Sequence, residues 1–357
     1  MVSQGAFWLS FRTPAHQKYG AFSQLSPIKA AHAAPLESSS MPPVHPKMAN
    51  PLEIALLALL GLLWGMPYAL TKIALTTIPP ITLVAARVAL AAAVLWTIVL
   101  FMRCKIPARR DVVGGLFVQG CLGCAIPYGL IAIAQQSVDS ALAAILNSPT
   151  PIFVFLISLA WTRHEPLTAG RIFGVTTGLG GVVLIAGANA LLGLGEAAAG
   201  QTAIIVATIS SAVGAIYSRR FAAVAPQVTA AGALTCAAVV LGPLCFLVEA
   251  PLQSAPSAAA IAALLANAVL ATALGFVLYF RLIRTIGSMG AASVSYLKPA
   301  AGVLIGCTLL GETLTWTAAL GLIAILTGVA AINPNSGRMQ RTSTGVAEKS
   351  AQEATHV

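Results

Sequence analysis

Two basic side chains stand inside long apolar stretches of this 357-residue chain. Lys298 follows Ser295 and Tyr296 and directly precedes Pro299, and Arg87 lies early in another apolar stretch. A charge is costly in hydrocarbon, so such residues face a polar cavity or a partner far more often than lipid. The chemistry that they offer is attraction of an anionic group, such as the carboxylate of a small solute.

Each of these residues also has a structural interpretation. A long basic side chain can run along its helix and place its charge among the lipid headgroups. Lys298 could therefore bind a solute or extend to the inner surface. Arg87 could bind an anion, close an outer gate or extend to the outer surface.

Polar and aromatic residues of other apolar stretches could complete a binding site. Asn147 and Gln119 both donate and accept hydrogen bonds, which suits a polar solute, although each could instead bond only to neighbouring helices. Aromatic walls could come from a tryptophan and two tyrosines. The candidate substrate-binding residues are Lys298, Tyr296, Asn147, Ser148, Thr150, Gln119, Trp64, Tyr68, Tyr217, Asn267 and Arg87.

Several other chemistries lack the residues that they need. No Asp, Glu or His stands in the middle of an apolar stretch, so Lys298 is the best candidate if protons are coupled. There is no Gly-x-x-x-x-Gly-Lys loop for ATP. The six cysteines lie in or beside the apolar stretches, and the Cys121-x-x-Cys124 pair has no second pair beside it. We therefore predict neither a cofactor nor a metal ion.

The elements that position these residues are predicted from hydrophobicity. Hydrophobic residues make up 58% of the chain and charged residues 8%, against about 25% charged residues in an ordinary soluble domain. Stretches of about 20 apolar residues are long enough to cross a bilayer as helices. The predicted spans are 52–70, 80–101, 112–134, 141–161, 170–189, 201–218, 228–248, 258–280, 290–310 and 315–332. This pattern predicts an all-α integral membrane protein with ten transmembrane helices in a lipid bilayer.

The distribution of basic residues predicts the orientation of these spans. The formal net charge is +10, but the basic residues are dispersed among short loops, so nucleic acid is not an expected partner. One set of alternate loops holds Arg103, Lys105, Arg109, Arg110, Arg163, Arg171, Arg219, Arg220, Arg281 and Arg284, and the other set holds only Lys72. The positive-inside rule then places both termini in the cytoplasm and the protein in the cell inner (plasma) membrane.

A pattern that occurs twice divides the chain into two repeats. Glu165, Leu167, Thr168, Gly174 and Gly181 recur 147 residues later as Glu312, Leu314, Thr315, Gly321 and Gly328. Five spans in each repeat is an odd number, so the second repeat must be inverted relative to the first.

Other residue types in the repeats predict local structure. Each Glu of the pattern precedes a helix, where a carboxylate stabilises the positive helix N-terminus. Small residues spaced four apart, Gly174 with Gly178 and Gly302 with Gly306, predict close helix packing. Prolines inside the spans, Pro149, Pro151 and Pro299, predict kinks that leave carbonyl groups free.

The two tails differ from the spans. Residues 1–49 are rich in Ser and Pro and are predicted to be a disordered extension. Two interpretations stay open, a transit peptide or an upstream extension of a chain that starts at Met48. Residues 335–357 are polar and are predicted to form a cytoplasmic tail.

Together these motifs resemble a known family. Trp64-Gly65 with Tyr68, Arg87, the Ala-rich fourth span with its prolines and the two closing signatures are similar to the drug/metabolite transporter superfamily, in its EamA-like branch of ten-helix carriers. The resemblance covers a first repeat at 52–189 and a second at 201–332. It implies two inverted five-helix repeats that expose a central site alternately to each side, with the fourth and ninth helices lining it.

The resemblance implies a secondary-active or facilitative transporter that exports small polar metabolites such as amino acids. The alternative is export of multiple drugs or hydrophobic cations. A membrane enzyme acting on lipid-linked substrates would need a clustered catalytic set, and the chain offers only His164 beside Arg163 and Glu165, so we do not expect an enzyme. A non-transporting sensor or assembly factor stays open, as does a homodimer.

Overall fold

The computed structural model describes residues 51–107, 110–162, 168–191, 196–249 and 255–332. Every regular element in these ranges is a helix. The predictions for the tails at 1–49 and 335–357, and for Arg163, His164 and Glu165, lie outside the described residues.

The helices of the described ranges follow the ten predicted spans. The first half contains α1 (Pro51–Ala74), α2 (Pro80–Phe101), a third span made of α3 (Arg110–Gly120), η2 (Cys121–Ala125) and α4 (Ile126–Ala134), a fourth made of α5 (Ser140–Leu146) and α6 (Thr150–Thr162), and α7 (Ala169–Leu191). The second half contains α8 (Glu196–Tyr217) with η3 (Ser218–Phe221), α9 (Pro226–Val248), an eighth span made of α10 (Ala258–Ala266), η4 (Asn267–Leu274) and α11 (Gly275–Ala292), then α12 (Val294–Leu309) and α13 (Trp316–Ile332).

Seven of the helices in the described ranges are long and apolar enough to cross a membrane, and three shorter apolar helices complete the set. The prediction of an all-helical membrane protein with ten helices is therefore confirmed. Two boundaries that place charged residues were wrong. Helix α1 continues to Ala74, so Lys72 lies in its last turn and not in a loop. The eighth helix continues to Ala292, so Arg281 and Arg284 lie on its last turns and not in a loop. A helix can extend past the hydrocarbon because its polar end is then solvated by headgroups and water.

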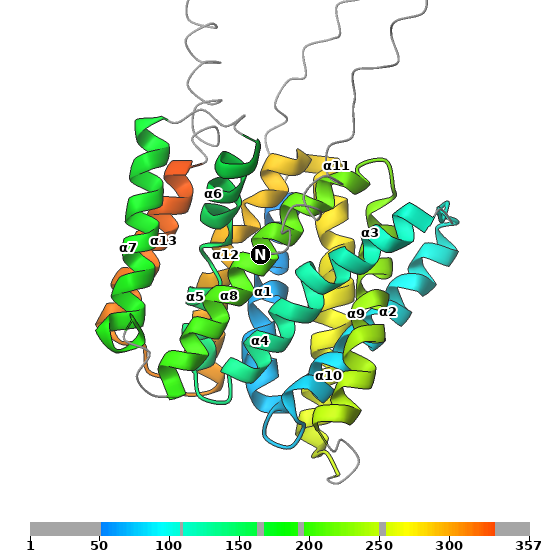
Figure 1. Cartoon of the computed structure of the whole chain (residues 1–357), viewed down its shortest axis with the longest axis horizontal. Coiled ribbons are helices and arrows are strands. Elements are labelled where there is room, and N and C mark those ends of the chain that lie inside the picture. The colour runs from blue at the N-terminus through cyan, green and yellow to red at the C-terminus, as the bar shows by residue number, and fades with distance from the viewer. Residues whose placement is uncertain (1–50, 108–109, 163–167, 192–195, 250–254, 333–357) are drawn as a thin grey trace, which may run out of the picture. The chain divides into compact units, whose positions relative to one another are not determined.

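The contacts between helices follow a twofold relation between the repeats. In the main contacts, replacing each helix by its counterpart in the other repeat gives a contact that is also found. Helix α1 packs against α12, and its counterpart α8 packs against the fourth span through α6. Counterpart helices also meet each other directly. In Figure 1, α7 and α13 lie side by side at one edge of the bundle, and α2 and α9 lie at the opposite edge.

The repeated glycines form the contact between α7 and α13. A Cβ atom added to Gly328 would lie 2.4 Å from the carbonyl oxygen of Gly174, and one added to Gly181 would lie 2.7 Å from that of Gly321. The first glycine of one helix therefore faces the second glycine of the other. The two counterpart helices run in opposite directions, which confirms the predicted inversion of the repeats.

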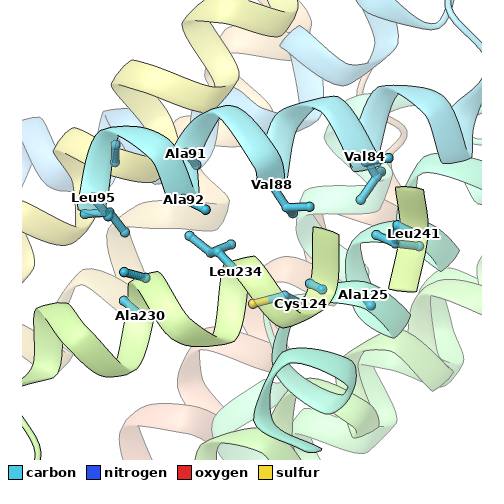
Figure 2. Close-up of a cluster of buried hydrophobic side chains, with 14 of the residues drawn as sticks. Val84, Val88, Ala91, Ala92, Leu95, Cys124, Ala125, Ala230, Leu234 and Leu241 are labelled. Atoms are coloured by element: carbon cyan, nitrogen blue, oxygen red, sulfur yellow. The ribbon is translucent and has the colours of Figure 1, made fainter. Parts of the chain in front are cut away.

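Larger side chains fill the contact at the other edge. Figure 2 shows residues of α2, among them Val88 and Leu95, pointing toward Leu234 of α9 and toward Cys124 at the bend of the third span. Alanines such as Ala91 and Ala230 let the two backbones approach between these side chains. This apolar cluster holds α2 in place and so positions Arg87, which the same helix carries.

Carboxylates tie the two repeats together at one end of the bundle. Glu249, after α9, accepts hydrogen bonds from the backbone N–H groups of Ile81 (2.9 Å) and Thr82 (2.8 Å) at the start of α2. Glu312, after α12, accepts hydrogen bonds from the backbone N–H groups of Ser140 and Ala141 at the start of α5, both at 2.8 Å. Each carboxylate satisfies N–H groups that a helix start leaves without partners.

We call this end of the bundle the clamp end. The sequence placed Glu312 at the start of the helix that follows it, α13, but its carboxylate caps α5 of the other repeat. The opposite end carries eight of the predicted inner basic residues, and we call it the basic end. Those residues are Arg103, Lys105, Arg110, Arg171, Arg219, Arg220, Arg281 and Arg284.

The first testable prediction concerns the glycine contact. Replacing Gly328 with Ala places a methyl group against the backbone of α7, so the two helices must separate, at a cost of about 1–3 kcal/mol. We expect the melting temperature of the purified protein to fall. The matched control is Gly180→Ala on α7, where no atom lies within 4 Å of the added Cβ. An equal fall in both variants would contradict the glycine contact.

Candidate functional site

A cavity of about 510 Å³ lies among helices of both repeats. Its walls come from α1, α2, the bends in the third, fourth and eighth spans, α8 and the start of α12. The volume suits a small metabolite. Seven of the eleven candidate residues line this central cavity: Lys298, Asn147, Ser148, Thr150, Trp64, Tyr68 and Arg87.

A break in the fourth span brings three of these residues to the cavity. Helix α5 ends at Leu146 and α6 begins at Thr150, so Asn147 and Ser148 lie in a turn between two half-helices. Pro149, in this turn, supplies no backbone N–H, and the sequence predicted a kink there. The hydroxyl groups of Ser148 and Thr150 donate to nearby backbone carbonyls, at 2.6 Å and 2.8 Å. Irregular backbone at membrane depth is tolerated where it lines such a cavity.

Two π-helical segments form matching parts of the wall. The segment η2 interrupts the third span and η4 interrupts the eighth, which is its counterpart in the second repeat. Gly123 of η2 and Ala271 and Thr272 of η4 line the cavity. Insertions of this kind rotate the side chains beyond them and occur often at functional sites. Nothing in the residue types indicated them.

The Arg87 guanidinium is buried, with 9% of the residue exposed, so this side chain does not extend to the membrane surface. Its Nε donates a hydrogen bond to the Thr272 hydroxyl at 3.2 Å, and the group lies over the Tyr128 ring, 4.5 Å from the ring centre. In the described part of the chain, its two terminal amino groups have no hydrogen-bond partner. Arg87 can therefore donate to an anion in the cavity.

Lys298 reaches the cavity from α12, in the second repeat. Its ammonium group lies over the ring of Tyr68, 5.9 Å from the ring centre. No hydrogen-bond acceptor within the described ranges contacts this ammonium group. Its three donors are therefore also available to a solute.

The cavity carries positive charge without a balancing acid. Among the residues that line it, Arg87 and Lys298 are charged, and there is no Asp, Glu or His. A buried charge without a partner is unfavourable unless a ligand supplies the opposite charge. The arrangement favours binding of a solute with at least one anionic group and disfavours a cation.

A hydrogen-bonded chain across the cavity wall fixes Asn147. Its side-chain amide donates to the Tyr68 hydroxyl at 2.6 Å. Its side-chain oxygen lies 3.1 Å from the Thr208 hydroxyl, whose single hydrogen it shares with the carbonyls of Ile204 (2.7 Å) and Leu146 (3.3 Å). These hydrogen bonds join α1, the break in the fourth span and α8. Tyr68 is thereby held beneath Lys298, so the aromatic wall and the cation keep one relative position.

Four candidate residues lie away from this cavity. Asn267 is fully buried and donates to the Thr71 hydroxyl, and the Tyr296 hydroxyl donates to the Val329 carbonyl. Tyr217 interacts with Arg220 at the basic end. Gln119 lines a different cavity. Residue type alone indicates these four, and the direction in which a side chain points on a bent helix does not follow from its type.

Several residues of the wall were missed by the sequence. The polar ones are Thr71, Tyr128, Gln135, Ser211, Thr272 and Ser295. Thr272 stands in an apolar helix, and a polar residue there is a usable signal. Gln135 begins the polar turn after α4, where a glutamine is an ordinary residue. Tyr128 stacks on Arg87, but a single tyrosine is too common in membrane helices to indicate this.

The second cavity, of about 370 Å³, lies beside the central one. Gly123, Tyr128 and Phe276 belong to the walls of both. Its remaining wall includes residues of the α8–α9 connection, such as Phe221 and Val224, which lie at the basic end. It therefore extends from the central cavity toward the basic end.

Ten helices in two inverted repeats around a central cavity are the architecture of a multi-pass membrane transporter. The model of the EamA-like transporter family matches residues 51–187 and again residues 198–333, which are the two repeats. The chain therefore belongs to the EamA-like transporter family, as its motifs suggested. It is a membrane transporter and not an enzyme.

Related proteins are transporters as well. The chain is 28% identical over 279 residues to "Uncharacterized inner membrane transporter YedA" of Escherichia coli strain K12, a match that covers 76% of this chain and 88% of that protein. It is 26% identical over 300 residues to "Probable amino-acid metabolite efflux pump" of Salmonella typhimurium strain LT2, covering 80% and 95%. A solved structure described as "Crystal structure of protein" shares the fold, with a TM-score of 0.57 and 22% identity over 80% of this chain and 98% of its own.

The second prediction tests the hydrogen-bonded chain through Asn147. Thr208→Val keeps the shape of the side chain but leaves the buried Asn147 oxygen without its partner, at a cost of about 1–3 kcal/mol. We expect a lower melting temperature. The control is Thr97→Val on α2, an exposed residue whose hydroxyl donates to the Ala93 carbonyl of its own helix. Equal melting temperatures for both variants would show that the hydrogen bonds through Asn147 contribute nothing to the stability of the protein.

Proposed function

We propose that this protein is a secondary-active or facilitative transporter that exports small polar metabolites with an anionic group, such as amino acids, by alternating access. The observation that carries the proposal is the pair of cations in the central cavity, Arg87 and Lys298, whose free donors face no acidic residue. A carboxylate would supply the missing charge and accept these hydrogen bonds. The relative in Salmonella typhimurium described as a probable amino-acid metabolite efflux pump supports the same class of solute.

The alternative solute class is a hydrophobic cation. Such a compound would enter a cavity that already holds two positive charges, in surroundings where charges are poorly screened. The cavity has aromatic walls in Trp64, Tyr68 and Tyr128, but Arg87 and Lys298 already occupy the faces of two of these rings. The charge pattern therefore favours the anionic class over the cationic one.

The proposed orientation places the basic end in the cytoplasm. The basic residues of that end follow the positive-inside rule, and the relative in Escherichia coli is described as an inner membrane transporter. The clamp end then faces the outside. There Glu249 and Glu312 bind the starts of α2 and α5, and Lys72 donates to the carbonyls of Gln135 (2.8 Å) and Val138 (3.1 Å).

These contacts hold the clamp end closed. The Glu249 and Glu312 contacts join the second repeat to the first, so an outward opening that separates the repeats must break them. The Lys72 contacts join α1 to the end of the third span within the first repeat. At the basic end, the position equivalent to Glu249 in the first repeat is Met102, which cannot cap the start of α9 in the same way. Among the described residues, the inward route through the second cavity therefore has no counterpart of the Glu249 clamp. Glu165, the counterpart of Glu312, lies outside the described residues.

The third prediction concerns this clamp. Glu249→Gln and Glu312→Gln each remove the charge from a capping group and leave one acceptor in place of two, so the closed state at the clamp end loses about 1–2 kcal/mol. We expect faster labelling of a cysteine placed at Thr71, in the cavity wall, by a membrane-impermeant thiol reagent applied outside cells. The native cysteines are first replaced. The control is Glu53→Gln, which changes a partly exposed carboxylate at the start of α1. Unchanged labelling in both clamp variants would contradict a gate at this end.

The fourth prediction tests the proposed solute class. Purified protein is screened for thermal stabilisation by amino acids, organic acids and hydrophobic cations, because a ligand that binds the folded state raises the melting temperature. We expect carboxylate solutes to stabilise the wild type and to lose most of this effect in Lys298→Ala and Arg87→Met. The control is Lys105→Ala, which removes an exposed lysine at the basic end. Stabilisation by hydrophobic cations alone, or equal shifts in all variants, would overturn the proposal.

A further inference from the structure

One acceptor oxygen in the wall of the central cavity has no partner. Gln135, at the end of α4, is 0% exposed and lines the cavity. Its side-chain Oε1 has no hydrogen-bond donor among the described residues. A buried amide oxygen without a donor is rare in folded proteins, because leaving it unpaired costs about 1–3 kcal/mol.

The orientation of this amide follows from its other contact. The Gln135 Nε2 donates to the backbone carbonyl of Tyr68 at 2.8 Å. A carbonyl can only accept, so the nitrogen must point toward α1 and the oxygen must be the free atom. The backbone is fixed as well, because the Gln135 carbonyl accepts a hydrogen bond from Lys72. The Gln135 side chain is therefore held in one position, with its free oxygen buried beside the cavity.

This acceptor complements the two cations. Arg87 and Lys298 offer donors only, and the Ser148 and Thr150 hydroxyls already donate to backbone carbonyls. A solute with a carboxylate alone satisfies the cations but leaves the Gln135 oxygen unpaired. A solute that also carries an N–H or O–H donor can satisfy both. A site built in this way discriminates against analogues that lack the donor.

We propose that Gln135 determines specificity by accepting a hydrogen bond from a donor group that the solute carries besides its carboxylate, which is the amino group in an amino acid. This inference rests on the proposed function, because it assumes that the carboxylate binds at Arg87 and Lys298. The role of Gln135 is recognition of the solute. The amine-bearing solute binds about tenfold or more tightly than its deaminated analogue, which corresponds to about 1.4 kcal/mol.

The experiment compares matched pairs of probes on the full chain in detergent. Each pair is an amino acid and the carboxylic acid that lacks its amino group: alanine with propionate, leucine with 4-methylpentanoate, and phenylalanine with 3-phenylpropionate. Dissociation constants are measured for the wild type, Gln135→Leu, Gln135→Glu and Gln201→Leu. Gln201 on α8 is the matched control, because its buried side-chain oxygen also lacks a donor within the described part of the chain but lies outside both cavities.

We expect the wild type and Gln201→Leu to prefer the amine-bearing member of the pair that binds, and Gln135→Leu to bind both members within about twofold. Gln135→Glu keeps an acceptor, so its preference for the amine-bearing solute is retained or increased. If Gln135→Leu does not fold, the Gln135→Glu variant alone tests whether residue 135 accepts the hydrogen bond from the solute. Loss of the preference in Gln135→Glu, or its persistence in Gln135→Leu, overturns the role of Gln135.

The failure of this inference differs from that of the proposed function. If carboxylates bind in a manner that depends on Lys298 and Arg87 but the wild type does not distinguish the members of any pair, the inference about Gln135 is wrong and the proposed solute class stands. If no carboxylate of any pair binds, the proposed function is overturned and the inference falls with it.

Discussion

A polar group inside a bilayer must find its partner within the protein, and the structure is arranged around this constraint. Hydrocarbon offers neither hydrogen bonds nor counter-charges. Most of the polar groups described above are either bonded to a neighbouring helix, as at Glu249 and Glu312, or face a cavity, as at Arg87 and Lys298. The difference between these two outcomes separates the structural polar residues of this chain from the candidate functional ones.

The charged residues near or within the spans illustrate this difference. Glu249 and Glu312 lie at helix ends, and each caps a helix of the other repeat. Lys72 caps the end of α4 through two backbone carbonyls. Arg87 and Lys298, in contrast, face the cavity with donors that no described residue uses. The two glutamates therefore hold the repeats together and Lys72 stabilises the first repeat, whereas Arg87 and Lys298 form the anion site of the proposed function.

Much of the fold could be predicted because it depends on properties of single residue types. Apolar stretches of sufficient length predicted the ten helices, and repeated glycines at fixed spacing predicted both the duplication and a close helix contact. The contact itself, Gly174 with Gly328, needed the structure because it depends on how α7 and α13 cross. The same limit applies to Glu312, whose partner helix lies in the other repeat.

The site was harder to predict because π-helical segments change which side of a helix faces the cavity. Gln119 precedes the segment η2 and lines the second cavity, whereas Gln135 follows it and lines the central one. Asn267 begins η4 and packs against α1, while Thr272, near the end of the same segment, bonds Arg87. A regular helical period extended through these segments assigns the wrong faces.

The most direct test of the central claim, that a positively charged central cavity carries anionic or zwitterionic solutes, is counterflow in vesicles. The purified protein is reconstituted, the vesicles are loaded with a mixture of unlabelled amino acids, and uptake of trace radiolabelled amino acids is compared with uptake of labelled tetraphenylphosphonium into vesicles loaded with that cation. We predict transient accumulation of at least one amino acid above the level in protein-free vesicles, and none of the cation. Accumulation of tetraphenylphosphonium without that of any amino acid would contradict the claim.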